Sequence, residues 1–109
     1  MKLENWVNIV QSEGAGEILI NSIDRDGSKK GYDFKIIDKI KKQIRVPIIF
    51  CGGVGHWKDF KMALNKKEID AVAAANIFHH FDQSDYLAKD YLIKHKIKNI
   101  RPPQFFKNP

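Results

Sequence analysis

Two carboxylates flank an arginine in the stretch Asp24-Arg25-Asp26, which is followed by Gly27. Carboxylates two positions apart around a guanidinium can hold one acid ionised while the other serves as a base or binds a substrate. The same spacing is also typical of a loop ion pair next to a helix cap, and structural ion pairs perturb carboxylate pKa values as well. Taken by itself, the spacing favours the structural role and leaves the chemical one open.

Two later segments have residues that suit an anion site. Cys51-Gly52-Gly53-Val54-Gly55 lies between a predicted strand and a predicted helix, and Ala73-Ala74-Ala75-Asn76 ends another strand. Glycines let backbone N–H groups approach an anion, and a helix N-terminus favours negative charge. Each segment alone is also compatible with a tight turn. In barrels of βα units, the loops after the last two strands commonly form one phosphate site together, so the two segments as a pair predict such a site.

The remaining reactive residue types do not form a metal site. His79 and His80 are adjacent and have no ligand spacing to another histidine or cysteine. We therefore expect them at a surface or an interface, and we predict no metal and no cofactor. Cys51 has no base near it in the sequence and is expected to fill space in the core. One cysteine cannot form an internal disulfide, which favours a reducing cytoplasm.

The elements that position these loops follow from hydrophobic spacing. The segment 18–24 is apolar and β-branched and is predicted to be a strand buried on both faces. Asp33 is the expected cap of the helix that follows it. Ser84 is the expected N-cap of the last helix, which is expected to show Leu87, Tyr91 and Ile93 or Lys94 along one face. The predicted helices are 3–13, 34–45, one that includes 57–64, and this last one; the predicted strands are 18–24, 48–51 and 70–75.

Alternating helices and strands indicate an α/β fold with a parallel sheet. The rhythm fits a barrel of βα units or an open, doubly wound sheet. Three strands cannot close a barrel, and an open sheet of three strands would leave its edges and apolar helix faces uncovered. We therefore expect that a partner chain, or more of this chain, completes the fold.

Length and composition bound the function. The chain has 109 residues, 43% hydrophobic and 29% charged, and is predicted to form a single domain over 1–109. Pro102-Pro103 forbids helix, so 102–109 is expected to be an irregular tail. No apolar run is long enough to cross a bilayer. The net charge of +6 suits anionic small molecules, and nucleic acid is disfavoured because no basic motif interleaved with aromatic residues is present.

Several of these segments together resemble a known family. The run GAGEILINSIDRDG at 14–27, with Gly31-Tyr32-Asp33 after it, closely resembles the cyclase subunit of imidazole glycerol phosphate synthase. Val46-Pro47-Ile48-Ile49 with the glycines of 52–55, and the segment 73–79, resemble it in the same order and at matching spacing. The resemblance covers almost the whole chain.

The resemblance implies the C-terminal part of a TIM (βα)8 barrel: three parallel βα units, strands six to eight, preceded by a helix. That family uses ammonia from a glutaminase partner to close an imidazole ring on a phosphorylated nucleotide. The products are imidazole glycerol phosphate and an aminoimidazole carboxamide ribonucleotide, at the branch between histidine and purine synthesis. The implied partners of this chain are the glutaminase, a phosphorylated small-molecule substrate, and a complementary half-barrel or a second copy.

The resemblance also assigns roles to individual residues. Asp26 matches the carboxylate that lines the site at the end of strand six, and Asn21 matches a position facing the barrel interior near the substrate. Four residues match the positions that bind one substrate phosphate, largely through backbone N–H groups: Gly52, Gly53, Ala75 and Asn76.

Several departures from the family pattern leave alternatives open. The principal acid/base aspartates of the family lie on strands one and five, which have no counterpart here, so we expect the chain to be inactive alone and to be a piece of a longer protein. Cys51 and Asn76 stand where serine is common. These residues, the His79-His80 pair and the longer tail also fit a paralogue that supplies ammonia for amidation of surface-polysaccharide sugars. A phosphate-binding half-barrel without catalysis is the remaining alternative.

Overall fold

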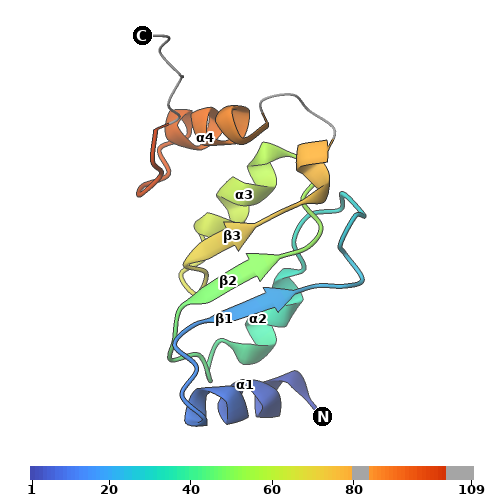
Figure 1. Cartoon of the computed structure of the whole chain (residues 1–109), viewed down its shortest axis with the longest axis vertical. Helices are drawn as coiled ribbons and strands as arrows, with labels where there is room; N and C mark the ends of the chain where they lie inside the picture. Colours follow the sequence, from blue (N-terminus) through green and yellow to red (C-terminus); the bar gives the residue numbers. More distant parts are fainter. Residues whose placement is uncertain (80–83, 103–109) are drawn as a thin grey trace, which may run out of the picture.

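A computed structural model describes residues 1–79 and 84–102, and it confirms an α/β fold. The strands run through the middle of the molecule, with α1 beyond one end of the sheet and α4 beyond the other (Figure 1). The elements in chain order are α1 (Leu3–Ser12), β1 (Ile18–Asn21), α2 (Phe34–Ile40), β2 (Ile48–Cys51), α3 (Trp57–Leu64), β3 (Ala71–Ala73), the short 3₁₀ helix η1 (Asn76–His79) and α4 (Ser84–Lys94).

The three strands form one parallel sheet in the order β1-β2-β3. Ile20 pairs with Phe50, and Phe50 pairs with Val72, so these side chains form a row across the sheet. Ile20 and Phe50 are buried in the core, together with Ile37 and Ile40 of α2. Figure 1 shows α2 and α3 behind the sheet, and this row therefore faces the helices.

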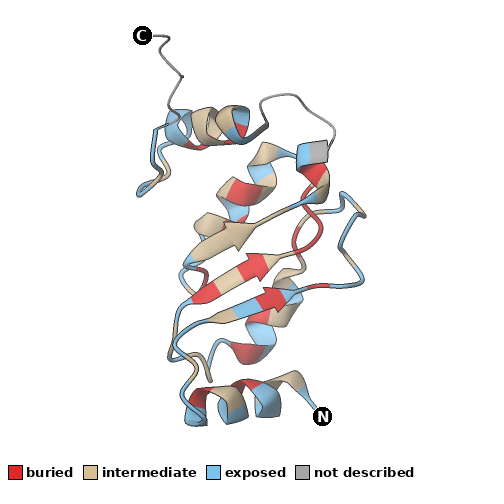
Figure 2. Cartoon of the chain, in the orientation of Figure 1, coloured by how far each residue is buried: buried red, intermediate tan, exposed pale blue. Residues whose placement is uncertain are grey.

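In the part of the chain that the structure describes, no helix covers the opposite face of the sheet. Leu19, next to buried Ile20, is 58% exposed. Asn21, Cys51 and Ala73 form the last row on this open face, at the carboxyl ends of the strands. Figure 2 shows buried and exposed positions alternating along β1. The prediction that β1 is buried on both faces is therefore wrong for this chain, because its alternate residues have nothing packed over them.

Two strands and one helix are shorter than predicted. β1 ends at Asn21 because Ser22 turns the chain: its carbonyl oxygen accepts from the N–H groups of both Arg25 and Asp26, and Ile23 is 83% exposed. β3 ends at Ala73 because η1 begins at Asn76.

The helix predicted over 34–45 ends as α2 at Ile40, because the next turn tightens. The N–H of Gln43 donates to the carbonyl oxygen of Ile40, three residues back, rather than four. Asp33 caps α2 as predicted, accepting from the N–H of Lys35 at 3.3 Å. Among described residues, no helix is long and apolar enough to cross a membrane.

The first and last helices pack through different kinds of residue. α1 covers almost the predicted segment and buries Val7 and Gln11. α4 includes Ser84 as its first residue, one residue earlier than an N-cap at Ser84 implies, and the side chain of Ser84 lies outside the described residues. The face of α4 that packs inward carries Ala88 and Leu92, both buried, whereas Leu87 is exposed, so the apolar positions read from the sequence were partly wrong. Of the predicted tail, only Pro102 is described.

Candidate functional site

Three loops meet at the carboxyl edge of the sheet. They follow β1, β2 and β3, and together they line a narrow cleft of about 10 Å³, enough for about one water molecule. Five of the six site residues predicted from the sequence line this cleft: Asp26, Gly52, Gly53, Ala75 and Asn76. The sixth, Asn21, lies beside it. Segments that are up to 50 positions apart in the chain are thus brought to one place by parallel strand order.

The loop after β1 is held by its arginine. Arg25 Nη1 donates to the carbonyl oxygens of Lys30 and Gly31 at 3.3 and 3.4 Å. In the described part of the chain, no ion pair joins Arg25 to Asp24 or Asp26. The loop ion pair favoured by the spacing is therefore not formed. The arginine closes the loop through backbone carbonyls instead, and this leaves both carboxylates exposed to solvent.

The two central glycines hold the loops against one another. Gly52 and Gly53 have φ angles of 104° and 106°, in the left-handed region that favours glycine. A Cβ on Gly52 would lie 2.6 Å from the carbonyl oxygen of Ser22 and 3.0 Å from Asn21 Oδ1. A Cβ on Gly53 would overlap the carbonyl oxygen of Gly31, whose own N–H donates to the Gly53 carbonyl at 2.7 Å. Side chains at these positions would push the loops apart.

The N-terminus of α3 is already occupied by groups of this chain. Asp59 Oδ2 accepts from the N–H groups of Gly55 and His56 at 2.8 and 3.0 Å. His56 Nδ1 accepts from the N–H of Lys58 at 3.1 Å, which completes a capping box. From the sequence we predicted that this helix N-terminus would help to bind an anion. In the structure those donors are used, so an anion has to be bound by the residues that precede Gly55.

Donors for an anion remain on both sides of the cleft. The N–H groups of Gly53, Ala75 and Asn76 have no acceptor within residues 1–79 and 84–102. Gly53 comes from the loop after β2, and the other two come from the turn that leads into η1. Backbone N–H groups that converge from two loops form the kind of concave donor site that binds phosphate oxygens.

Cys51 lies between this cleft and the open face of the sheet. Burial raises the pKa of its thiol, and the negative charge of Asp26 raises it further. A raised pKa keeps the thiol protonated at neutral pH, which makes it a poor nucleophile. Cys51 is half-buried, so it fills space at the edge of the core, and the chemistry of the site has to come from other groups.

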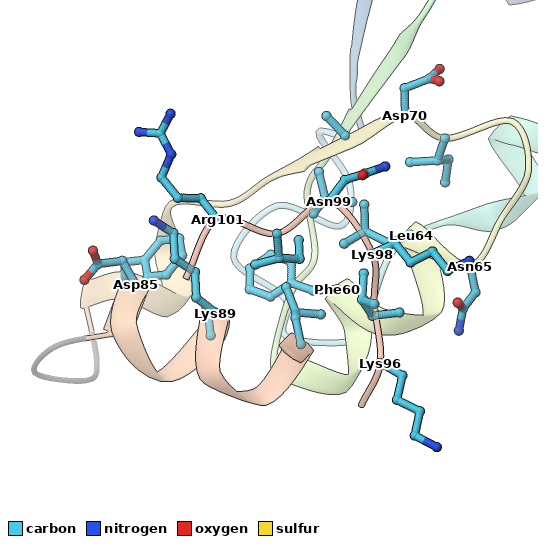
Figure 3. A pocket seen from close by; sticks show the side chains of 18 residues that line it. Phe60, Leu64, Asn65, Asp70, Asp85, Lys89, Lys96, Lys98, Asn99 and Arg101 are labelled. Atoms are coloured by element: carbon cyan, nitrogen blue, oxygen red, sulfur yellow. The ribbon is translucent and has the colours of Figure 1, made fainter. Parts of the chain in front are cut away.

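A larger groove lies on the side of β3 that faces the helices (Figure 3). It has a volume of about 760 Å³ and lies between α3, α4 and the segment 96–101. Phe60 and Leu92 are part of its apolar floor, and Lys89, Arg101 and Asp85 contribute charges of both signs to its wall. None of the six residues predicted from the sequence lines this groove. The cleft is therefore the better candidate site.

Sequence reasoning missed the side chains that support the loops. Tyr32 is 4% exposed, and its hydroxyl donates to the carbonyl oxygen of Ala73 at 3.0 Å. Asp59 caps α3 and so takes up its free donors. The spacing of Asp59 three residues after His56 is the signal that could have indicated the capping box. His80 lies outside the described residues, as does the side chain of His79, so their predicted surface position stays a prediction.

A comparison with protein families gives a match over residues 1–84, to the family described as histidine biosynthesis protein. The match includes all three strands and all three loops of the cleft. This chain belongs to that family. The family has the TIM-barrel fold, and the parallel strands with helices on one face only are what part of such a barrel requires.

Curated relatives agree with this membership. The chain is 45% identical to imidazole glycerol phosphate synthase subunit HisF of Pelodictyon phaeoclathratiforme over 87 aligned residues. These residues make up 80% of this chain and 35% of the relative. The chain is 38% identical over 98 residues to HisF of Bacillus pumilus, covering 90% and 39%. It is 39% identical over 97 residues to a putative synthase subunit hisF2 of Vibrio vulnificus, covering 89% and 35%.

The chain spans little more than a third of the length of these relatives. The open face of its sheet and the unpaired edges of β1 and β3 lie where more strands of a barrel belong.

Proposed function

We propose that this chain forms the phosphate-binding side of a cyclase-type barrel, which makes imidazole glycerol phosphate when it is complete. The observation that carries the proposal is the convergence of three loops in one cleft, with the free N–H groups of Gly53, Ala75 and Asn76 on its two sides. The enclosed part of the cleft admits about one water molecule. A substrate phosphate therefore sits at its mouth, with the rest of the substrate over the open face of the sheet.

Asp26 and Asn21 are the residues proposed to meet the reacting part of the substrate. Asp26 is exposed, lines the cleft and is not ion-paired among the described residues. Asn21 is exposed at the end of β1, with its side-chain oxygen beside Gly52. A free carboxylate can act as a general base or bind a polar group, and an amide can donate and accept at once.

The open face and edges of the sheet determine the partners that we propose. Leu19, Ile49 and Cys51 lie on the open face, and parallel strands are normally covered on both faces. A complementary half-barrel would cover this face and supply the further carboxylates that the reaction needs. The ammonia would come from a glutaminase subunit, as the resemblance to the cyclase family implies; the relatives are named as subunits of a synthase. A reducing cytoplasm suits the single thiol, Cys51.

Phosphate binding is tested by titrating the isotopically labelled chain with inorganic phosphate and following the backbone amides by NMR. We expect the amide signals of Gly53, Ala75 and Asn76 to shift together, and potassium chloride at equal ionic strength not to shift them. The variant Asn76→Asp places a negative charge at the cleft and should abolish the response. Asn8→Asp makes the same charge change on the exposed side of α1 and is the matched control.

Two outcomes would contradict the proposal. A phosphate response spread over surface lysines, with no selective shift at the three amides, would show that the cleft is not the binding site. Ammonia-dependent formation of imidazole glycerol phosphate by the purified chain alone would show that the chain needs no complementary half.

A second candidate, a phosphate-binding half-barrel without catalysis, rests on the same open face. A second copy could cover that face as well as a complementary half could. Sedimentation at several concentrations distinguishes the two: a stable dimer that binds phosphate favours the second candidate. A monomer that becomes active only with a complementary half favours the first.

A further inference from the structure

Tyr32 lies in the loop after β1 and contacts both β2 and the last residue of β3. It follows Gly31 in the loop after β1, and Gly31 N–H donates to the carbonyl oxygen of Gly53 in the loop after β2. The ring of Tyr32 stacks on Phe50 of β2, with 5.3 Å between the ring centroids. Its hydroxyl reaches the end of β3 and donates to the carbonyl oxygen of Ala73 at 3.0 Å. Within the described residues, these contacts join segments up to 41 positions apart.

The bond to Ala73 lies next to the proposed donors. Ala73 is the last residue of β3, and the free N–H groups of Ala75 and Asn76 follow it by two and three positions. β3 is short and lies at an edge of the sheet. Within the described residues β2 is the strand that pairs with it, and Ile77 of η1, which follows, is buried in the core. Between these two contacts, the hydroxyl of Tyr32 adds a hydrogen bond at the last residue of β3.

We propose that Tyr32 is a positioning residue, which sets the N–H groups of Ala75 and Asn76 opposite that of Gly53 so that both sides of the cleft bind one phosphate. This inference rests on the proposed phosphate site. The side chain of Tyr32 is buried and does not line the cleft, so Tyr32 would act on the phosphate only by positioning other residues. Burial also raises the pKa of Tyr32, which keeps the hydroxyl protonated and able to donate at any pH where the chain is folded.

The test compares Tyr32→Phe with the unchanged chain. Phenylalanine keeps the ring that packs on Phe50 and removes only the hydroxyl. We expect the affinity for inorganic phosphate, followed at the Gly53 amide, to fall about 3- to 10-fold, the loss expected for one hydrogen bond. Hydrogen exchange of the Phe78 amide, which donates to the carbonyl oxygen of Ala75 at 3.0 Å, should become faster, whereas exchange in β1 should stay unchanged.

Two control variants separate positioning from loss of stability. Ile40→Val removes one methylene from a fully buried residue of α2, away from the cleft, and lowers the stability of the same core. Tyr91→Phe removes a tyrosine hydroxyl from α4. Both should leave phosphate affinity within about twofold of the unchanged chain, because neither touches the bond to Ala73.

The outcomes separate the positioning role of Tyr32 from the proposed phosphate site, so that each can fail without the other. If the unchanged chain binds no phosphate but Tyr32→Phe speeds exchange of the Phe78 amide, the phosphate site is wrong and the positioning by Tyr32 stands. If phosphate binds equally to both chains and exchange does not change, the positioning role is overturned and the phosphate site stands. A loss of affinity of equal size in Ile40→Val would also overturn it.

A measurement on the unchanged chain covers the case in which Tyr32→Phe does not fold. A hydroxyl proton bonded to a buried carbonyl exchanges slowly and is visible by NMR, close to the Hα of Ala73. A fast-exchanging Tyr32 hydroxyl would overturn the inference without any variant.

Discussion

The side-chain oxygen of Gln11 accepts a hydrogen bond from the backbone N–H of Arg45 at 2.6 Å. The side-chain nitrogen of Gln11 donates to the carbonyl oxygen of Gln43 at 2.8 Å. One buried amide thus satisfies a donor and an acceptor in the turn that leads into β2. These bonds join α1 to the segment after α2. They explain why a glutamine lies on the otherwise apolar, inward face of α1.

We predict that Gln11→Ala destabilises the chain by about 1–3 kcal/mol, because it leaves a backbone donor and a backbone acceptor without partners. Gln11→Glu should also destabilise the chain, because it buries a carboxylate with one oxygen facing the carbonyl oxygen of Gln43. Urea unfolding measures both changes. Asn8→Ala, on the exposed side of α1, is the control and should change stability little. Equal stability of Gln11→Ala and Asn8→Ala would contradict the role of this amide.

The fold of this chain could be predicted from sequence because hydrophobic spacing and loop residues are local signals. The strands, the helix order and the cap at Asp33 follow from residues near each other in the chain. The open face of the sheet could not be predicted in this way. The residues Ile18-Leu19-Ile20 predict a strand whether or not something covers Leu19, since the burial of Leu19 depends on residues far from it in sequence.

The supporting side chains escaped prediction for a related reason. Tyr32 and Gln11 act through bonds to backbone atoms 41 and 34 positions away. No spacing rule identifies a backbone carbonyl as the partner of a distant side chain. The cleft itself could be predicted, because the ends of parallel strands meet at one edge of a sheet. The sequence alone could not show whether the N–H groups before α3 bind an anion or donate to Asp59, because both uses need the same residues.

Asp59→Ala is expected to destabilise the chain by about 0.5–2 kcal/mol, the usual cost of losing an N-terminal cap. The reason is that the N–H groups of Gly55 and His56 lose their shared acceptor. Thermal unfolding gives the comparison with Asp38→Ala, which removes only an exposed pair to Lys41 on α2. That pair is worth at most a few tenths of a kcal/mol. If both variants unfold at the same temperature, Asp59 is not the cap described here.

The two faces of β1 should respond differently to truncation. Ile20→Val should cost about 0.5–1.5 kcal/mol, because it leaves a cavity among buried side chains. Leu19→Ala should cost less than about 0.5 kcal/mol in this chain, because Leu19 is 58% exposed. Urea unfolding of the chain alone checks both. A large loss for Leu19→Ala would mean that the open face is already covered in solution, by a second copy of the chain.

The thiol of Cys51 provides a test of the distance between the loops after β1 and β2. Burial is the larger cause of its raised pKa, and the negative charge of Asp26 adds to it. A raised pKa means that a smaller fraction is thiolate at any given pH. We therefore expect iodoacetamide to alkylate Cys51 with a pH midpoint above that of a free cysteine.

Removing the charge at Asp26 should move that midpoint in a known direction. In Asp26→Asn the thiolate no longer faces a carboxylate, so its pKa falls and alkylation at pH 8 becomes faster. The midpoint should nevertheless stay above that of a free cysteine, because the larger cause, burial, remains. Asp24→Asn is the matched control: it removes the same charge two positions away, from a residue that does not shift the thiol. Equal rates for the two variants would show that Asp26 does not face the cleft in solution.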